Sequence, residues 1–114
     1  MRAMERKEKI FYPDEVAAIA TRLGNRIRIA RTRRKIRQED LAARTRLSRS
    51  TIQAIERGEN TCAIGSVLHV LWTLGLSNEV EFIGDPGLDE GGLAITLSEG
   101  RRRVRIATKI DNDF

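Results

Sequence analysis

Apolar residues recur at helical spacing in the first third of the chain. Five of them are separated by steps of 4, 3, 4 and 3: Val16, Ala20, Leu23, Ile27 and Ala30. This spacing places them on one face of an α-helix. Pro13 suits the first turn of such a helix, so we expect it to run from residue 13 to about residue 34. Gly24 interrupts the helix at a cost of roughly 1 kcal/mol and allows a bend there.

Three shorter helices are expected next, over residues 38–44, 48–57 and 63–74. Ser48 can cap the second of these with its hydroxyl group. Gly58 and Gly75 can adopt the left-handed conformation that ends a helix. In the last segment the following residues share a face and are expected in the core: Ile64, Val67, Leu68, Leu71 and Leu74.

The tail has a different pattern, in which apolar residues alternate with polar ones over 93–97 and again over 104–110. A period of two favours a β-hairpin, or a strand that pairs with a second subunit. A basic tail with four arginines (Arg101, Arg102, Arg103 and Arg105) is the alternative. We therefore divide the chain into a basic N-terminal arm (1–12), a helical domain (13–76) and a C-terminal extension for dimerisation or partner binding (77–114).

Positive charge is concentrated in the helical part. The chain carries a net charge of +5, and between Arg22 and Arg49 there are eleven basic residues against two acidic ones. A solvated helical face explains some of this density. The rest of it favours a polyanionic partner.

Composition argues against several other classes of protein. No apolar run has the ~20 residues of a membrane span, and the basic start lacks the apolar stretch of a secretory signal, so we expect a cytoplasmic protein without a membrane partner. Cys62 and His69 are the only cysteine and histidine, which argues against a disulfide, a metal site or a catalytic triad. There is no glycine loop for a nucleotide and no cluster of acids, so neither an enzyme nor a cofactor is expected.

The most informative stretch is residues 38–57, which read QEDLAARTRLSRSTIQAIER. Its first helix must cross its second, and Ala42 is small enough for the contact. The second helix keeps one outward face with short polar groups and arginine, which suits the major groove of DNA. Arg49 there can make a bidentate contact to guanine. RNA is disfavoured because no aromatic stacking platform appears.

Residues 23–76 resemble the Xre/Cro-type helix-turn-helix domains of bacterial and phage repressors. The matching stretches are LGNRIRIAR, Gln38, Leu41-Ala42, SRSTIQAIERG and LHVLWTLGL. The resemblance implies an all-α, lambda-repressor-like domain of five helices, to which the extension adds a short β-strand or hairpin. It also implies a scaffold ion pair between Arg31 and Glu56.

The DNA-binding residues follow from the resemblance and from the outward face together. They are Arg37, Gln38, Ser48, Arg49, Ser50, Gln53, Ala54 and Arg57. Three positions depart from the family pattern. Arg37 stands at the position where the family usually has a Ser or Thr cap. Lys35 and Arg46 stand where a glycine in the left-handed conformation is common, and each substitution costs about 1 kcal/mol of stability.

Val70 and Trp72 lie off the expected core face of the fourth helix. They are either core residues at its flank or a surface for a dimer or another partner. The ending VLWTLGL is also similar to HipB-like antitoxins, which bind a HipA-like kinase toxin. We therefore expect a homodimeric, autorepressing regulator of a palindromic operator in double-stranded DNA. The alternative is an antitoxin whose main task is to neutralise such a kinase.

Overall fold

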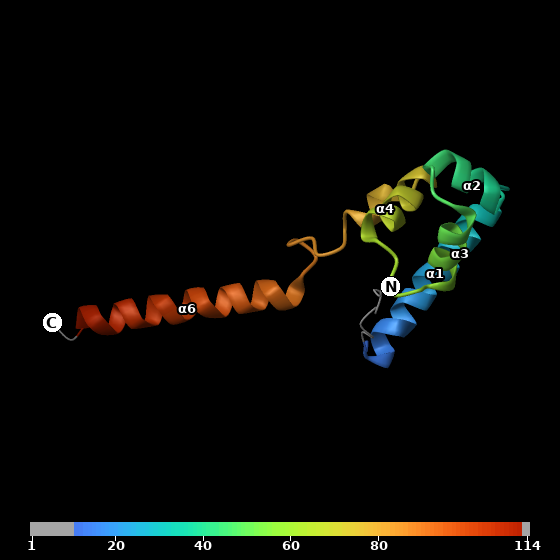
Figure 1. Ribbon diagram of the computed structural model, residues 1–114. Helices are drawn as coiled ribbons and strands as arrows, with labels where there is room; N and C mark the ends of the chain where they lie inside the picture. The colour runs from blue at the N-terminus through green and yellow to red at the C-terminus, as the bar shows by residue number, and fades with distance from the viewer. Residues whose placement is uncertain (1–10, 113–114) are drawn as a thin grey trace, which may run out of the picture. The chain divides into compact units, whose positions relative to one another are not determined.

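The computed structural model describes residues 11–112, and its described residues contain helices but no strand (Figure 1). The chain divides after Ser77 into two units, which are described separately. The first unit holds α1 (Asp14–Arg33), α2 (Gln38–Thr45), α3 (Arg49–Arg57) and α4 (Ile64–Thr73). The second holds α6 (Glu90–Asn112), and the four-residue α5 (Ser77–Val80) lies where the units join. None of the described helices is both long enough and apolar enough to cross a membrane.

The four helices of the first unit begin and end close to the residues expected from the sequence. Ser48 caps α3 as predicted, because its Oγ accepts a hydrogen bond from the backbone N–H of Thr51 at 3.1 Å. Gly58 ends α3 with a φ of 76°. Lys35 and Arg46 do adopt left-handed conformations, with φ values of 56° and 59°. Four helices lie within residues 13–76, and the four-residue α5 follows directly at Ser77. The five-helix, lambda-repressor-like assignment stays a prediction.

Gly24 allows α1 and α3 to pack in direct backbone contact. A Cβ at this position would lie 2.6 Å from the carbonyl oxygens of both Ile55 and Glu56. Gly58 meets α1 in the same way, since its Cβ would lie 2.5 Å from the carbonyl oxygen of Ala20. The two glycines therefore set the distance between α1 and α3. Gly24 is needed for this contact rather than for a bend, because α1 continues through it unbroken.

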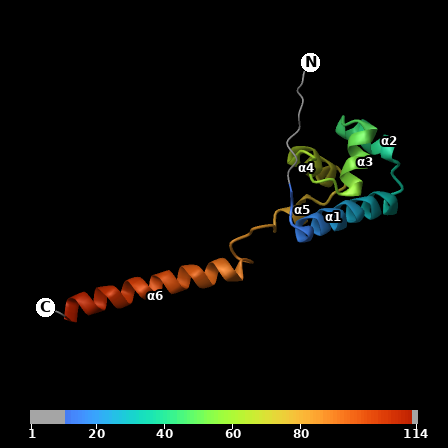
Figure 2. The ribbon, with the colours of Figure 1, turned by 60° about the horizontal axis from the view of Figure 1, so that its bottom comes forward.

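The core of the unit is aliphatic and lies where α1, α2, α3 and α4 meet. Its most deeply buried side chains come from each of these helices: Ile27, Leu41, Ile52 and Val70. α3 contacts both α1 and α2, α2 also contacts α4, and the four helices lie close together in Figures 1 and 2. Charged and polar groups are rare in this interior, and among the described residues only Thr45 and Glu56 are buried polar residues.

The buried face of α4 differs from the one expected. Val70 is fully buried, so it is a core residue and not part of a dimer or partner surface. Ile64 and Leu68, expected in the core, are 75% and 41% exposed. The reason is that α4 packs against α2 mainly through its last turns, where Val70, Leu71 and Leu74 are buried. The first turn of α4 lies outside that contact.

Packing is also incomplete along the first half of α1. Val16 and Leu23 are expected in the core, yet each is about 40% exposed, at 42% and 40%. They line a groove of about 290 Å³ together with Ile64 and Val67 from α4. The sequence predicted the right face of α1, but the buried residues on that face all lie in the second half of the helix, from Gly24 onward.

The expected strands of the extension are wrong, because residues 90–112 form the 23-residue helix α6. Asp89, the residue before α6, caps its N-terminus, because its Oδ1 accepts a hydrogen bond from the backbone N–H of Gly92 at 3.0 Å. The segment alternates at a period of two, but it also repeats at steps of 4 and 3 through Leu93, Leu97, Gly100 and Val104. No proline occurs after Pro86, and Ser98-Glu99-Gly100, interpreted as a turn, lies inside the helix.

Candidate nucleic-acid interface

The α3 helix has one buried face and one open face. Ile52 and Ile55 point into the core, and α3 packs on both α1 and α2. On the open face, Arg49, Ser50 and Arg57 are exposed, and Gln53 and Ala54 are half-buried. The predicted reading side chains therefore lie together on the accessible side of one helix. This is the arrangement that a helix needs to enter the major groove.

An ion pair between α1 and α3 fixes the base of this helix. The Arg31 guanidinium donates from Nε to Glu56 Oε2 at 2.6 Å and from Nη2 to Glu56 Oε1 at 3.0 Å. The side chains are only 12% and 4% exposed, so the pair is largely shielded from water. Arg31 also donates to the carbonyl oxygen of Ile36, in the turn before α2. These are the two residues for which the sequence suggested a scaffold ion pair.

The same network holds Gln38, the first residue of α2. Its Nε2 donates to Glu56 Oε1 at 3.0 Å, and its Oε1 accepts a bond from Gln53 Nε2 at 3.4 Å. The side chain of Gln38 is therefore engaged by α3 in the absence of DNA. Gln53, on the reading helix, is linked through Gln38 to the buried carboxylate.

Asp40 replaces the missing cap of α2. Its carboxylate accepts bonds from the backbone N–H and from the guanidinium of Arg37, at 3.2 and 3.1 Å. Arginine has no acceptor, so the reciprocal half of a capping box is absent. The hydrogen bonds from Arg37 lower the pKa of Asp40, and the hydrogen bond to Asp40 raises the pKa of Arg37. Since the folded pKa of Asp40 is depressed, this cap stabilises the fold above the carboxyl's ordinary pKa and is lost as the pH falls through the lowered value.

Arg57, at the end of the open face, is paired with an acid. Its Nε and Nη2 donate to Glu59 Oε2 at 3.0 and 2.5 Å, and both side chains are exposed. Cys62 lies nearby, half-buried, and burial raises the pKa of its thiol. Sequence reasoning missed both Asp40 and Glu59, although their spacing of three and two residues from an arginine was visible. The described residues contain no cluster of potential metal ligands.

Residues 22–81 match a family model described as "Helix-turn-helix domain". The match covers more than half of the chain, and it includes all of α2, α3 and α4. The chain belongs to this helix-turn-helix family, whose fold defines a class of DNA-binding regulators. No curated protein and no solved structure matches the chain.

Proposed function

We propose that this protein is a sequence-specific DNA-binding regulator that inserts α3 into the major groove. The observation that carries the proposal is the open face of α3, held by the buried Arg31–Glu56 pair. The charge of this part of the chain supports it, since eleven basic residues against two acidic ones occur between Arg22 and Arg49, in α1, α2, the turns around α2 and the first residue of α3. Such a surface attracts the phosphate backbone whatever the sequence.

Each residue of the open face has a proposed role. Arg49 makes a bidentate contact to guanine, Ser50 bonds a base edge, and Ala54 contacts a thymine methyl group. Ser48 has its hydroxyl occupied by the cap and by Thr51, so it contributes less to base reading than a free serine would. Gln53 and Arg57 lie at the edge of the footprint. Gln38 and Arg37 approach phosphates at the N-terminus of α2.

The regulator acts as a homodimer on a palindromic operator and represses its own gene. Two copies of α3 then enter successive major grooves, about 34 Å apart. A single nine-residue helix reads only a few base pairs. Two half-sites raise both affinity and selectivity, and this supports the dimer.

We predict that Arg49→Ala relaxes base preference, while Arg44→Ala weakens binding to every sequence alike. Arg49 stands on the reading face, so its loss costs about 1–3 kcal/mol on the preferred site and much less on random DNA. Arg44 is an exposed residue of α2, so its loss lowers the salt slope of binding by about one phosphate contact. Fluorescence anisotropy on both DNAs over a salt series measures the two effects. Equal losses for both variants on both DNAs would contradict the assigned roles.

The proposed function is tested on the DNA immediately upstream of the protein's own gene. A gel shift with random DNA as competitor should show a complex that survives competition, and Arg49→Ala should make that complex sensitive to the same competitor. A complex that random DNA removes as easily as specific DNA would leave only nonspecific binding. Circular dichroism of the Arg49→Ala chain serves as the control for folding, and it should match the wild type because Arg49 is exposed.

A second candidate function is favoured by one observation, the exposure of Trp72. Its side chain is 66% exposed, and on the same side of α4 lie Leu68 and Ile64, at 41% and 75%. Large apolar side chains that align on one helix face are typical of interaction surfaces. An antitoxin that binds a HipA-like kinase would use such a surface, with DNA binding as operon autoregulation.

We predict that Trp72→Ala separates the two functions. It should lower affinity for the protein encoded beside the gene by about 2 kcal/mol or more, as for a central aromatic contact. DNA affinity should stay within twofold of the wild type, since Trp72 lies outside α2 and α3. Co-purification and gel shifts with the neighbouring protein added measure both. If Arg49→Ala, in contrast, abolished the protein complex, α3 and not α4 would be the partner surface.

A further inference from the structure

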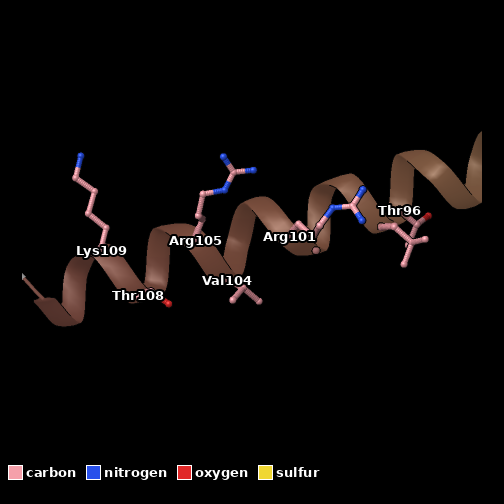
Figure 3. Close-up of a pocket in the computed structure, with 8 residues that line it drawn as sticks. Thr96, Arg101, Val104, Arg105, Thr108 and Lys109 are labelled. Carbon is pink, nitrogen blue, oxygen red and sulfur yellow. The ribbon is translucent and has the colours of Figure 1, made fainter.

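The α6 helix presents an apolar seam that nothing in its own unit covers. Leu93, Leu97 and Val104 are 55%, 51% and 67% exposed. With Gly100 and Ala107 they follow steps of 4, 3, 4 and 3, the spacing of a two-stranded coiled-coil seam. Figure 3 shows Val104 and Thr108 on one side of the helix, and Arg105 and Lys109 on another. A shallow groove runs beside this seam, lined by Thr96, Leu97, Gly100 and Val104 among others.

Gly100 is unexplained within the chain. It lies in the middle of α6, where glycine costs about 1 kcal/mol relative to alanine. A Cβ added there would meet nothing within 4 Å, so no described part of the molecule requires its absence. The absence of a side chain at this position in the seam can therefore affect only the packing of another molecule against α6. It leaves a hole that a large apolar side chain can fill.

Charge along this unit is divided into two blocks of opposite sign. Residues 78–99 contain six acidic residues and no basic one, whereas residues 100–109 contain five basic residues and no acidic one. Among the described residues, none of the ion pairs involves a side chain of α6. The five basic residues of 100–109 therefore take part in none of these ion pairs, and an acidic segment of a second molecule would supply partners for them.

We propose that α6 pairs in an antiparallel manner with α6 of a second copy of this chain. In this register Leu97 of each copy fills the hole at Gly100 of the other, and Leu93 lies against Val104. Glu90, at the start of one helix, then approaches Arg105 and Lys109 near the end of its partner. A parallel pair would place the arginines of both copies side by side and oppose two glycines. The antiparallel pair separates the arginine clusters by about nine residues, or roughly 13 Å along the axis. The proposal rests on the dimer of the proposed function and assigns its interface.

The first test is the mass of the full chain in solution. Analytical ultracentrifugation over a concentration series should give a dimer for the wild type. Leu97→Asp should weaken self-association about tenfold or more, because it places a charge in the seam. Ile95→Asp is the matched control. It makes the same substitution two residues away, at a position 67% exposed and off the seam, so its mass should match the wild type.

Cross-linking tests the orientation. In a Cys62→Ser background, Leu93→Cys and Val104→Cys should each fail to cross-link to themselves under mild oxidation. A mixture of these two single variants should form a disulfide-linked dimer, because antiparallel pairing brings the two positions within bridging distance. In this register position 93 of one copy lies about 16 Å along the axis from position 93 of the other, and the same holds for position 104, so neither single variant can bridge to itself. Self-cross-linking of each single variant would indicate a parallel pair and overturn the register.

Other outcomes would overturn the proposal and identify a different role. If Leu97→Asp stays dimeric while Trp72→Ala becomes monomeric, the dimer interface is on α4. If the wild type is monomeric at every concentration and Arg105→Gln/Lys109→Gln loses affinity for random DNA, α6 contacts DNA instead. A dimer that cross-links as expected but shows no DNA preference would remove the proposed function and leave the α6 pair intact.

Discussion

Gly24→Ala is expected to destabilise the first unit by about 3 kcal/mol. The added methyl group would lie 2.6 Å from two backbone carbonyl oxygens of α3, which cannot rotate away as a flexible side chain would. The helices must separate, and the cost belongs to the upper end of the range for overpacked cores. It outweighs the gain of about 1 kcal/mol that alanine brings to a helix interior. Urea unfolding followed by circular dichroism measures the difference.

Gly65→Ala is the matched control for this prediction. Gly65 also lies within a helix, but a Cβ there would meet nothing within 4 Å. The same substitution should therefore stabilise the protein, by up to about 1 kcal/mol. Opposite signs for one chemical change would show that the α1–α3 contact, and not helix propensity, determines the need for Gly24. A Gly24→Ala chain as stable as the wild type would mean that the helices are further apart than described.

The sequence predicted the helix-turn-helix part of the fold well because its signals are local. Helix bounds follow from caps and periodicity, and Ser48 and Gly58 flank the nine residues of α3 on either side. The open face of α3 follows from the same periodicity. Long-range contacts were harder to predict. No local signal distinguishes a glycine that bends α1 from one that touches α3, and the contact of Gly24 with Glu56 spans 32 residues.

Errors arose where burial depends on a neighbouring helix. The spacing of apolar residues in α4 allows two adjacent faces, one through Leu68 and one through Val70, and only packing against α2 selects the second. In α6, alternation at a period of two coexists with steps of 4 and 3, so the pattern fits a strand and a helix equally. Gln38 begins α2 and Arg37 directly precedes it, as expected, and their role in DNA binding stays a prediction. Both side chains are hydrogen-bonded within the protein, Gln38 to Glu56 and Arg37 to Asp40.

Glu56→Ala is expected to cost about 3–5 kcal/mol of stability, the second large effect. It removes the acceptor of two Arg31 bonds and one Gln38 bond. The Arg31 charge would then remain in a site only 12% exposed, without a partner and largely without water. Thermal and urea unfolding measure the loss. Glu59→Ala is the control, because it breaks an exposed pair with Arg57 and should cost less than about 1 kcal/mol.

The double substitution Arg31→Leu/Glu56→Leu distinguishes a buried charge from a missing contact. If the cost of Glu56→Ala comes mainly from the unpaired Arg31, removing both charges should recover most of the lost stability. DNA selectivity should not recover with it, because Gln38 loses its acceptor on α3 in both variants and Gln53 is held through Gln38. The double variant would then have most of the wild-type stability but not the wild-type base preference. A double variant that regains full preference would show that α3 is positioned by its apolar face alone, and that the ion pair serves only the scaffold.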